Sequence, residues 1–235
     1  MTLMLASVTN CFEVEKLLTA GVDIIDIKDP GKGALGALPC EEVREIVKLV
    51  NHRRPVSATI GDVTSPRLIS PAIEEMSGTG VDIVKVGIFT RQLSAEYRGL
   101  LKKHSESGIS IVLVFFADIG YSIDDIKALA GMSVKGVMLD TAIKSSGSLS
   151  SFLDDKQLAE FVSTAHEHRL LAGLAGSLRL EDINRLLSLA PDYLGFRGAL
   201  CRDRQRINEI DLEAAMQIRS MIARSNYDEL NFKIA

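Results

Sequence analysis

The stretch Asp23-Ile24-Ile25-Asp26-Ile27-Lys28-Asp29-Pro30 sets the pattern from which the fold follows. A short apolar run ends in charged residues and a proline, and a helical segment comes after it. Seven other apolar runs follow the same plan, over residues 3–8, 56–60, 81–86, 109–116, 136–139, 170–175 and 192–196. Eight such units in 235 residues leave about 29 residues each, which is the size of one strand plus one helix.

Helical spacing of apolar residues predicts helices between these strands, over residues 11–20, 41–51, 154–166, 178–189 and 208–222. Gly21 is a helix stop signal, and Asp154 or Asp155 is a suitable N-cap. Eight alternating units without a linker favour a single (β/α)8 TIM barrel, an α/β fold, over residues 1–224, with a C-terminal tail over 225–235. A doubly wound sheet is the alternative, but the first turn, residues 7–10, lacks the glycines of a dinucleotide loop.

Composition excludes several classes of protein. The chain is 46% hydrophobic with a net charge of −4, which excludes disorder and gives no basic excess for nucleic acid. No apolar run is long enough to span a membrane, and no basic leader precedes residues 3–6. The three cysteines form no C-x-x-C pair and fit a reducing compartment. We therefore expect a cytoplasmic protein that acts on a small molecule and is compatible with a homo-oligomer.

Charged residues gather where the predicted strands end, and barrel enzymes place their catalytic groups at that rim. Strand alternation puts Asp26 and Lys28 on one face with Ile24. A lysine, Lys85, interrupts the buried fourth strand. The convergent set is Asp26, Lys28, Lys85, Asp118, Asp140 and Lys144, in which Asp118 is the weakest candidate.

Two lysines and a carboxylate at one rim are typical of Schiff-base chemistry. A neutral lysine attacks a carbonyl to form an imine, a second cation favours that neutral amine, and a carboxylate relays protons. The alternatives are a strand-end lysine that reaches solvent and a lysine that binds phosphate. The histidines are spaced as solvated helix ends rather than as ligands, so we expect neither a metal nor a cofactor.

The turns after strands seven and eight predict a phosphate site made by Gly176, Ser177, Arg197 and Gly198. A helix beginning near Leu178 would add its N-terminal dipole, and Arg197 would clamp the phosphate. The alternative is that these are simply tight turns. The charged run 202–206 reads as a solvated loop or as an extension of the anion site. Residues 29–36 lack the end of a nucleotide loop and read as a mobile lid.

Taken together, these residues resemble one family, the (5-formylfuran-3-yl)methyl phosphate synthases, also called 4-(hydroxymethyl)-2-furancarboxaldehyde phosphate synthases. The resemblance covers nearly the whole chain in the same order. It rests on residues 23–30, 33–36, 56–62, 84–87, 138–144, 174–177 and 196–199. The string over 138–144, Met-Leu-Asp-Thr-Ala-Ile-Lys, is the most specific of these.

The resemblance implies a barrel lyase that joins two glyceraldehyde 3-phosphate molecules into a furan, releases phosphate and water, and serves methanofuran biosynthesis. It makes Lys28 the Schiff-base lysine and Lys85 the proton acceptor, with Asp26, Asp140 and Lys144 completing the acid–base set. Phe116 stands where the family often has a tyrosine. Two other readings stay open at this point: a class I aldolase-type enzyme, and a triose-phosphate-binding protein without activity.

Overall fold

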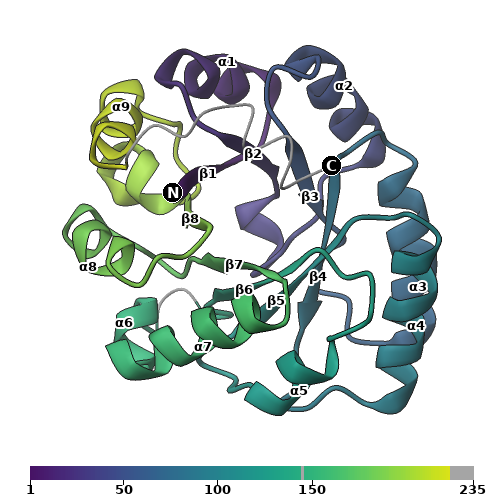
Figure 1. Ribbon diagram of the computed structural model, residues 1–235. Coiled ribbons are helices and arrows are strands. Elements are labelled where there is room, and N and C mark those ends of the chain that lie inside the picture. Colours follow the sequence, from purple (N-terminus) through teal and green to yellow (C-terminus); the bar gives the residue numbers. More distant parts are fainter. Residues whose placement is uncertain (144–145, 223–235) are drawn as a thin grey trace.

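The protein folds as a closed barrel of eight parallel strands surrounded by helices (Figure 1), as its computed structural model shows. The structure describes residues 1–143 and 146–222. Each strand pairs with the next one, and β8 pairs with β1. The strands are β1 (Leu3–Val8), β2 (Ile24–Ile27), β3 (Val56–Thr59), β4 (Ile83–Ile88), β5 (Ile111–Phe116), β6 (Gly136–Asp140), β7 (Leu171–Leu174) and β8 (Tyr193–Phe196). The predicted (β/α)8 barrel is therefore confirmed.

The helices lie outside the barrel of strands. They are α1 (Cys11–Ala20), α2 (Cys40–Val50), α3 (Pro66–Ser77), α4 (Ala95–Glu106), α5 (Ile123–Ala128), α6 (Leu149–Phe152), α7 (Asp155–Glu167), α8 (Ile183–Leu187) and α9 (Leu212–Met221). Short 3-10 turns are η1 (Pro30–Lys32), η2 (Leu180–Asp182), η3 (Gly198–Leu200) and η4 (Arg202–Arg204). Gly21 ends α1 in the left-handed conformation, and the side chain of Asp154 caps α7, both as predicted.

Two predicted helices begin later than expected. Ser177 is left-handed and Arg179 is extended, so the chain first turns at η2 and α8 is only five residues long. The prediction of a helix N-terminus at Leu178 is therefore wrong. The helix predicted from residue 208 begins at Leu212, because Asp211 caps it and Ile210 pairs with Cys201. Residues 223–235 lie outside the described part, so the boundary at 224 and the tail stay predictions.

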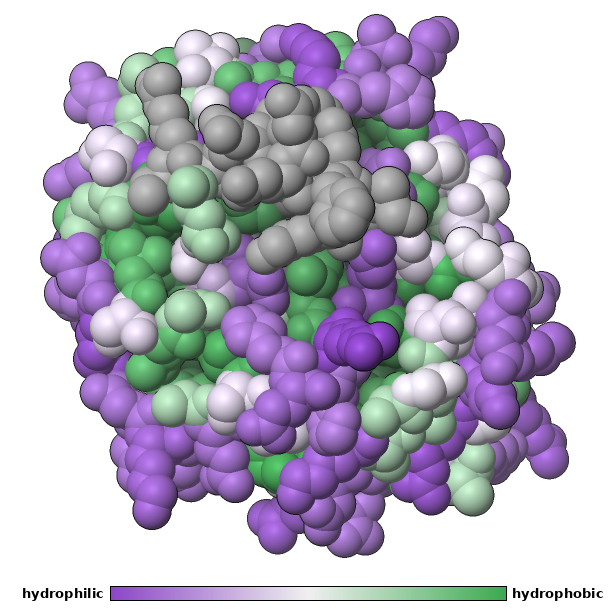
Figure 2. Space-filling model, viewed as in Figure 1, coloured by the Kyte–Doolittle hydropathy of each residue, from purple (hydrophilic) through white to green (hydrophobic). Residues whose placement is uncertain are grey.

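Strand alternation separates two apolar layers. Ile25 and Ile27 of β2 pack outward against the helices, whereas Ile24 packs inward with Leu3, Leu5, Val112, Val114 and Met138. Asp26 and Lys28 follow Ile24 in register and therefore face the barrel interior. Figure 2 shows that hydrophilic residues dominate the outside of the molecule in this view. Among the described helices, none combines the length and the apolar character that a membrane crossing requires.

Candidate active site

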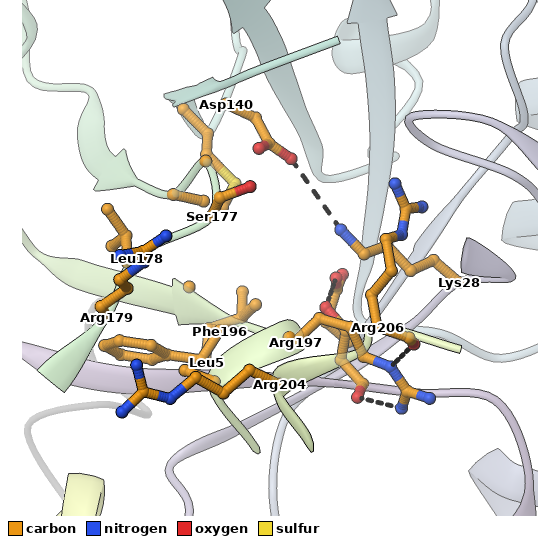
Figure 3. A pocket seen from close by; sticks show the side chains of 18 of the residues that line it. Leu5, Lys28, Asp140, Ser177, Leu178, Arg179, Phe196, Arg197, Arg204 and Arg206 are labelled. Carbon is orange, nitrogen blue, oxygen red and sulfur yellow. Dashed lines mark hydrogen bonds and ion pairs between the residues drawn. The ribbon is translucent and has the colours of Figure 1, made fainter. Parts of the chain in front are cut away.

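A cavity of about 450 Å³ opens at the carboxyl ends of β1, β2, β6, β7 and β8 (Figure 3). Its charged inner wall is made by Asp26, Lys28 and Asp140. Its other walls come from the turn after β7 and from the long loop after β8. Four predicted residues, Asp26, Lys28, Lys85 and Asp140, thus lie within one small region of the barrel.

Lys28 and Asp140 face each other across the floor of this cavity. The Lys28 Nζ lies 3.8 Å from Asp140 Oδ2, as the dashed line in Figure 3 marks. Only 7% of Lys28 and 2% of Asp140 are exposed to solvent. The other oxygen of Asp140 accepts a hydrogen bond of 2.8 Å from the Thr141 N–H, which fixes the carboxylate. An amine and a carboxylate are therefore held side by side in a largely dry site that a small molecule can enter.

Asp26 is fully buried and is held by three side chains, from the adjacent strands β1 and β3 and from β4. Its Oδ1 accepts hydrogen bonds from the Lys85 ammonium at 2.9 Å and the Ser57 hydroxyl at 2.7 Å. Its Oδ2 accepts one from the Ser7 hydroxyl at 2.9 Å. Burial alone would raise the pKa of Asp26. The charges of Lys85 and Lys28, with these hydrogen bonds, outweigh burial and hold that pKa below its usual value.

Lys85 lies behind Asp26 and does not line the large cavity. It is 2% exposed, and its side chain borders a separate void of about 20 Å³ that is lined mainly by apolar residues on the amino-terminal side of the barrel. Leu35, Phe89 and Phe116 close the barrel above this part. The rings of Phe89 and Phe116 lie 4.7 Å apart, and a Cβ added to Gly87 would meet Leu35 at 2.8 Å. Lys85 therefore reaches the cavity through the Asp26 carboxylate.

Arg197 was expected to clamp a phosphate, but its guanidinium already donates all five of its N–H groups. Two go to the carboxylate of Glu13, at 2.6 and 3.0 Å. The other three go to the carbonyl oxygens of Ser7, Arg206 and Asn208. In this structure the side chain of Arg197 fastens the loop after β8 to β1 and α1. The pattern of the sequence gave no sign of its partner Glu13, which lies 184 residues earlier.

The other residues of the expected phosphate site, Gly176, Ser177 and Gly198, line the cavity. Gly176 has φ +106° and Ser177 has φ +52°, so two successive residues are left-handed. The N–H groups of Gly176 and Ser177 donate no hydrogen bond to another described residue. Backbone N–H groups that point together from such a turn form a concave site for an anion.

Three arginines, Arg179, Arg204 and Arg206, line the cavity beyond this turn. Arg206 donates from Nη2 to the carbonyl oxygen of Gly33 at 2.7 Å, and so joins the loop after β8 to the loop after β2. Burial lowers the pKa of the Arg206 guanidinium and Arg197 lowers it further, while Asp140 raises it. Sequence reasoning gave the run 202–206 first as a solvated loop. Its second interpretation, an extension of the anion site, agrees with the position of Arg204 and Arg206 at the cavity.

Two aspartates, Asp62 and Asp118, hold loops near the entrance of the cavity by accepting their backbone N–H groups. Asp118 accepts hydrogen bonds from the N–H groups of Ala142 and Ile143, both at 2.7 Å, and does not line the cavity. Asp62 does the same for Ala34 and Leu35, at 2.9 and 2.7 Å, so the segment expected as a lid is docked. Lys144 lies outside the described residues. Among the residues described, no group of three His, Cys, Asp or Glu could hold a metal ion.

Comparison with known proteins places this site in context. The family model described as 4-HFC-P synthase matches residues 4–219. A protein of Methylorubrum extorquens, provisionally named (5-formylfuran-3-yl)methyl phosphate synthase, is 42% identical over 88% of this chain and 86% of its own length. A Methanopyrus kandleri protein that carries this name is 36% identical over 86% of this chain and 92% of its own. Phosphoribosyl anthranilate isomerase from Thermus thermophilus shares the fold alone, with a TM-score of 0.66 and 13% identity, over 94% of this chain and 98% of that structure.

Proposed function

The chain belongs to the 4-HFC-P synthase family, and from this membership we propose that it is a lyase that condenses two glyceraldehyde 3-phosphate molecules into (5-formylfuran-3-yl)methyl phosphate. The observation that carries the proposal is the position of Lys28, whose Nζ lines the cavity 3.8 Å from Asp140. We place the reaction in the cytoplasm, in methanofuran biosynthesis.

The first proposed step forms an imine. The neutral amine of Lys28 attacks the aldehyde carbon of one triose phosphate, and a water molecule leaves. Asp140, beside Lys28, transfers protons to and from the oxygen that departs. The iminium ion that results withdraws electrons and makes the hydrogen on the next carbon acidic.

The second proposed step removes that proton and gives an enamine. Lys85 is the final acceptor in its neutral amine form, and Asp26 relays the proton to it, because the Asp26 carboxylate contacts both the cavity and the Lys85 Nζ. The enamine electrons then break the bond between the third carbon and the phosphate oxygen. Phosphate leaves with that electron pair, a carbon–carbon double bond forms, and the iminium ion returns.

The remaining steps join the second triose phosphate and close the ring. Lys144 completes the acid–base set that these dehydrations need. Two three-carbon units give a six-carbon furan that keeps one phosphate, and one phosphate and two water molecules leave. The balance involves no net oxidation or reduction, so the reaction needs no redox cofactor. The turn of Gly176 and Ser177, with Gly198 from the turn after the neighbouring strand β8, binds a substrate phosphate, and Arg197 holds the loop that carries Gly198.

The test is a product assay on the purified protein. With glyceraldehyde 3-phosphate, we expect a new ultraviolet absorption from the furan aldehyde and release of inorganic phosphate. Lys28→Ala should lose both signals, whereas Lys48→Ala, an exposed lysine on α2, should keep them. An open-chain sugar phosphate without the absorption would indicate an aldolase instead. Reversible binding without any covalent adduct would indicate a binding protein.

A further inference from the structure

Arg206 is a cation at the mouth of the large cavity, and it has no role in the proposed mechanism. It lines the cavity with Lys28 and Asp140, and it lies close enough to Asp140 for that carboxylate to raise its pKa. Figure 3 shows Lys28 and Arg206 on one side of the cavity and Arg179 and Arg204 on the other. Among the described residues, the Gly33 carbonyl is its one hydrogen-bond acceptor, so its Nε and Nη1 groups and the second Nη2 hydrogen remain to bind a ligand.

The loop that carries Arg206 is held in one defined conformation. Asp203 and Arg204 both have φ +55°, a conformation that costs a non-glycine residue free energy and persists only where its surroundings impose it. Arg197 donates to the carbonyl oxygens of Arg206 and Asn208, and Cys201 pairs with Ile210 across the base of the loop. Arg206 is therefore held at the cavity by the partly buried hydrogen bonds of its loop and by its own bond to the Gly33 carbonyl.

The proposed reaction requires two separate phosphate sites. The two trioses lie in one cavity when they join, and each brings a phosphate. The phosphate that leaves departs from a carbon two positions from the imine carbon, so it lies near Lys28. The phosphate that the product keeps lies on the other triose. The cavity offers one anion site at the turn of Gly176 and Ser177 and a second cation, Arg206, on the Lys28 side.

We propose that Arg206 binds the phosphate that leaves from the Lys28-linked triose, while the Gly176–Ser177 turn holds the phosphate that the product keeps. This inference rests on the proposed function. As the carbon–oxygen bond breaks, its electron pair goes to the phosphate, and the planar guanidinium neutralises the growing charge with paired N–H donors. The bond to the Gly33 carbonyl keeps the guanidinium in place before substrate arrives.

The test compares Arg206→Gln with the wild-type protein and with Arg202→Gln. Arg202 lies on the same loop but outside the large cavity, so its variant should behave as wild type. We expect Arg206→Gln to lower kcat by about 10- to 100-fold, the range for a hydrogen bond to a charged group. Inhibition by inorganic phosphate should weaken with it. Arg206→Lys should lie between, because it keeps the charge and loses the paired donors.

Two measurements separate this role from a folding defect. Trapping by borohydride with glyceraldehyde, which has no phosphate, should label Arg206→Gln as fully as wild type. Trapping with glyceraldehyde 3-phosphate should then show, in Arg206→Gln, a larger share of adduct that still carries its phosphate than in wild type. A kcat and a phosphate inhibition within twofold of wild type in Arg206→Gln would overturn the proposal.

A failure of the proposed function would give a result that differs from a failure of the role of Arg206. In that case the wild-type protein itself would give no furan, with or without an adduct on Lys28. Binding of inorganic phosphate, followed by calorimetry, still decides the role of Arg206. Weaker binding by Arg206→Gln than by Arg202→Gln supports the anion site, and equal binding overturns it.

Discussion

Asp26 is the residue on which the polar interior of the barrel depends. It is fully buried and accepts hydrogen bonds from Lys85, Ser57 and Ser7. Removing the charge from one partner of a buried pair leaves the other uncompensated. We expect Asp26→Asn to lower the free energy of unfolding by about 3 kcal/mol. Ser57→Ala should cost about 2 kcal/mol, the contribution of one hydrogen bond to a charged group, and leaves the ion pair in place. Unfolding by urea, followed by circular dichroism, measures both.

The lowered pKa of Asp26 predicts how the free energy of unfolding depends on pH. The folded state holds the pKa of Asp26 below its usual value, so Asp26 contributes stability above the unfolded pKa of about 3.9 and loses it as pH falls through the folded pKa. The stability difference between wild type and Asp26→Asn should therefore stay constant from about pH 7 to about pH 5 and shrink below about pH 4. A difference that grows on acidification contradicts the depressed pKa.

At the scale of elements, the loop after β2 depends on one carboxylate from the loop after β3. Asp62 accepts the N–H groups of both Ala34 and Leu35, and Leu35 packs into the inner core. We expect Asp62→Ala to speed hydrogen exchange at these two amides by about 10- to 100-fold, because a hydrogen bond to a charged group is lost.

Asp118→Ala is the matched control for this loop. It should speed exchange at Ala142 and Ile143, whose N–H groups Asp118 accepts, and leave Ala34 and Leu35 unchanged. Mass spectrometry of the exchanged protein resolves the two segments. Unchanged exchange of Ala34 and Leu35 in Asp62→Ala would show that the other contacts, the packing of Leu35 and the bond from Arg206 to Gly33, hold the loop without Asp62.

The strands and the charged floor could be predicted because alternation with a period of two is a local property. It placed Asp26 and Lys28 on the inner face with Ile24, as the structure does. Helix starts were less predictable where one residue decides them, as the left-handed Ser177 delays the turn before α8.

Contacts between segments far apart in the chain could not be predicted from the local pattern of one sequence. Arg197 was predicted to face a ligand, because a strand-end arginine beside glycine reads the same whether it binds phosphate or a carboxylate of the protein. Its partner Glu13 lies on α1, and barrel closure alone brings the two together. For the same reason the sequence could not decide whether the run that contains Arg206 is a solvated loop or an extension of the anion site, since the position of Arg206 at the cavity depends on Arg197.

At the scale of the whole molecule, buried ion pairs close the seam between the first and last units, which lie side by side in Figure 1. Glu13 pairs with Arg197, and Asp23 pairs with Arg219 at 3.2 Å. We expect Glu13→Ala to cost about 3 kcal/mol, because it leaves a buried guanidinium unpaired. For a chain of this size that lowers Tm by about 6–12 °C.

Glu15→Ala is the control for the seam. Glu15 faces Arg53 at 3.8 Å on the surface, where an ion pair contributes under about 1 kcal/mol. Its Tm should stay within about 4 °C of wild type. Equal melting of Glu13→Ala and Glu15→Ala would mean that the seam is held by strand pairing and packing, without the ion pair.

If Lys28 forms the imine, the trapped adduct must lie on Lys28. The protein is incubated with glyceraldehyde 3-phosphate and borohydride, digested, and its peptides are analysed by mass spectrometry. We expect one reduced adduct, on the peptide that contains Lys28, and none in Lys28→Ala. An adduct on Lys85 or Lys144, or none on a wild-type protein that still makes the furan, would contradict it.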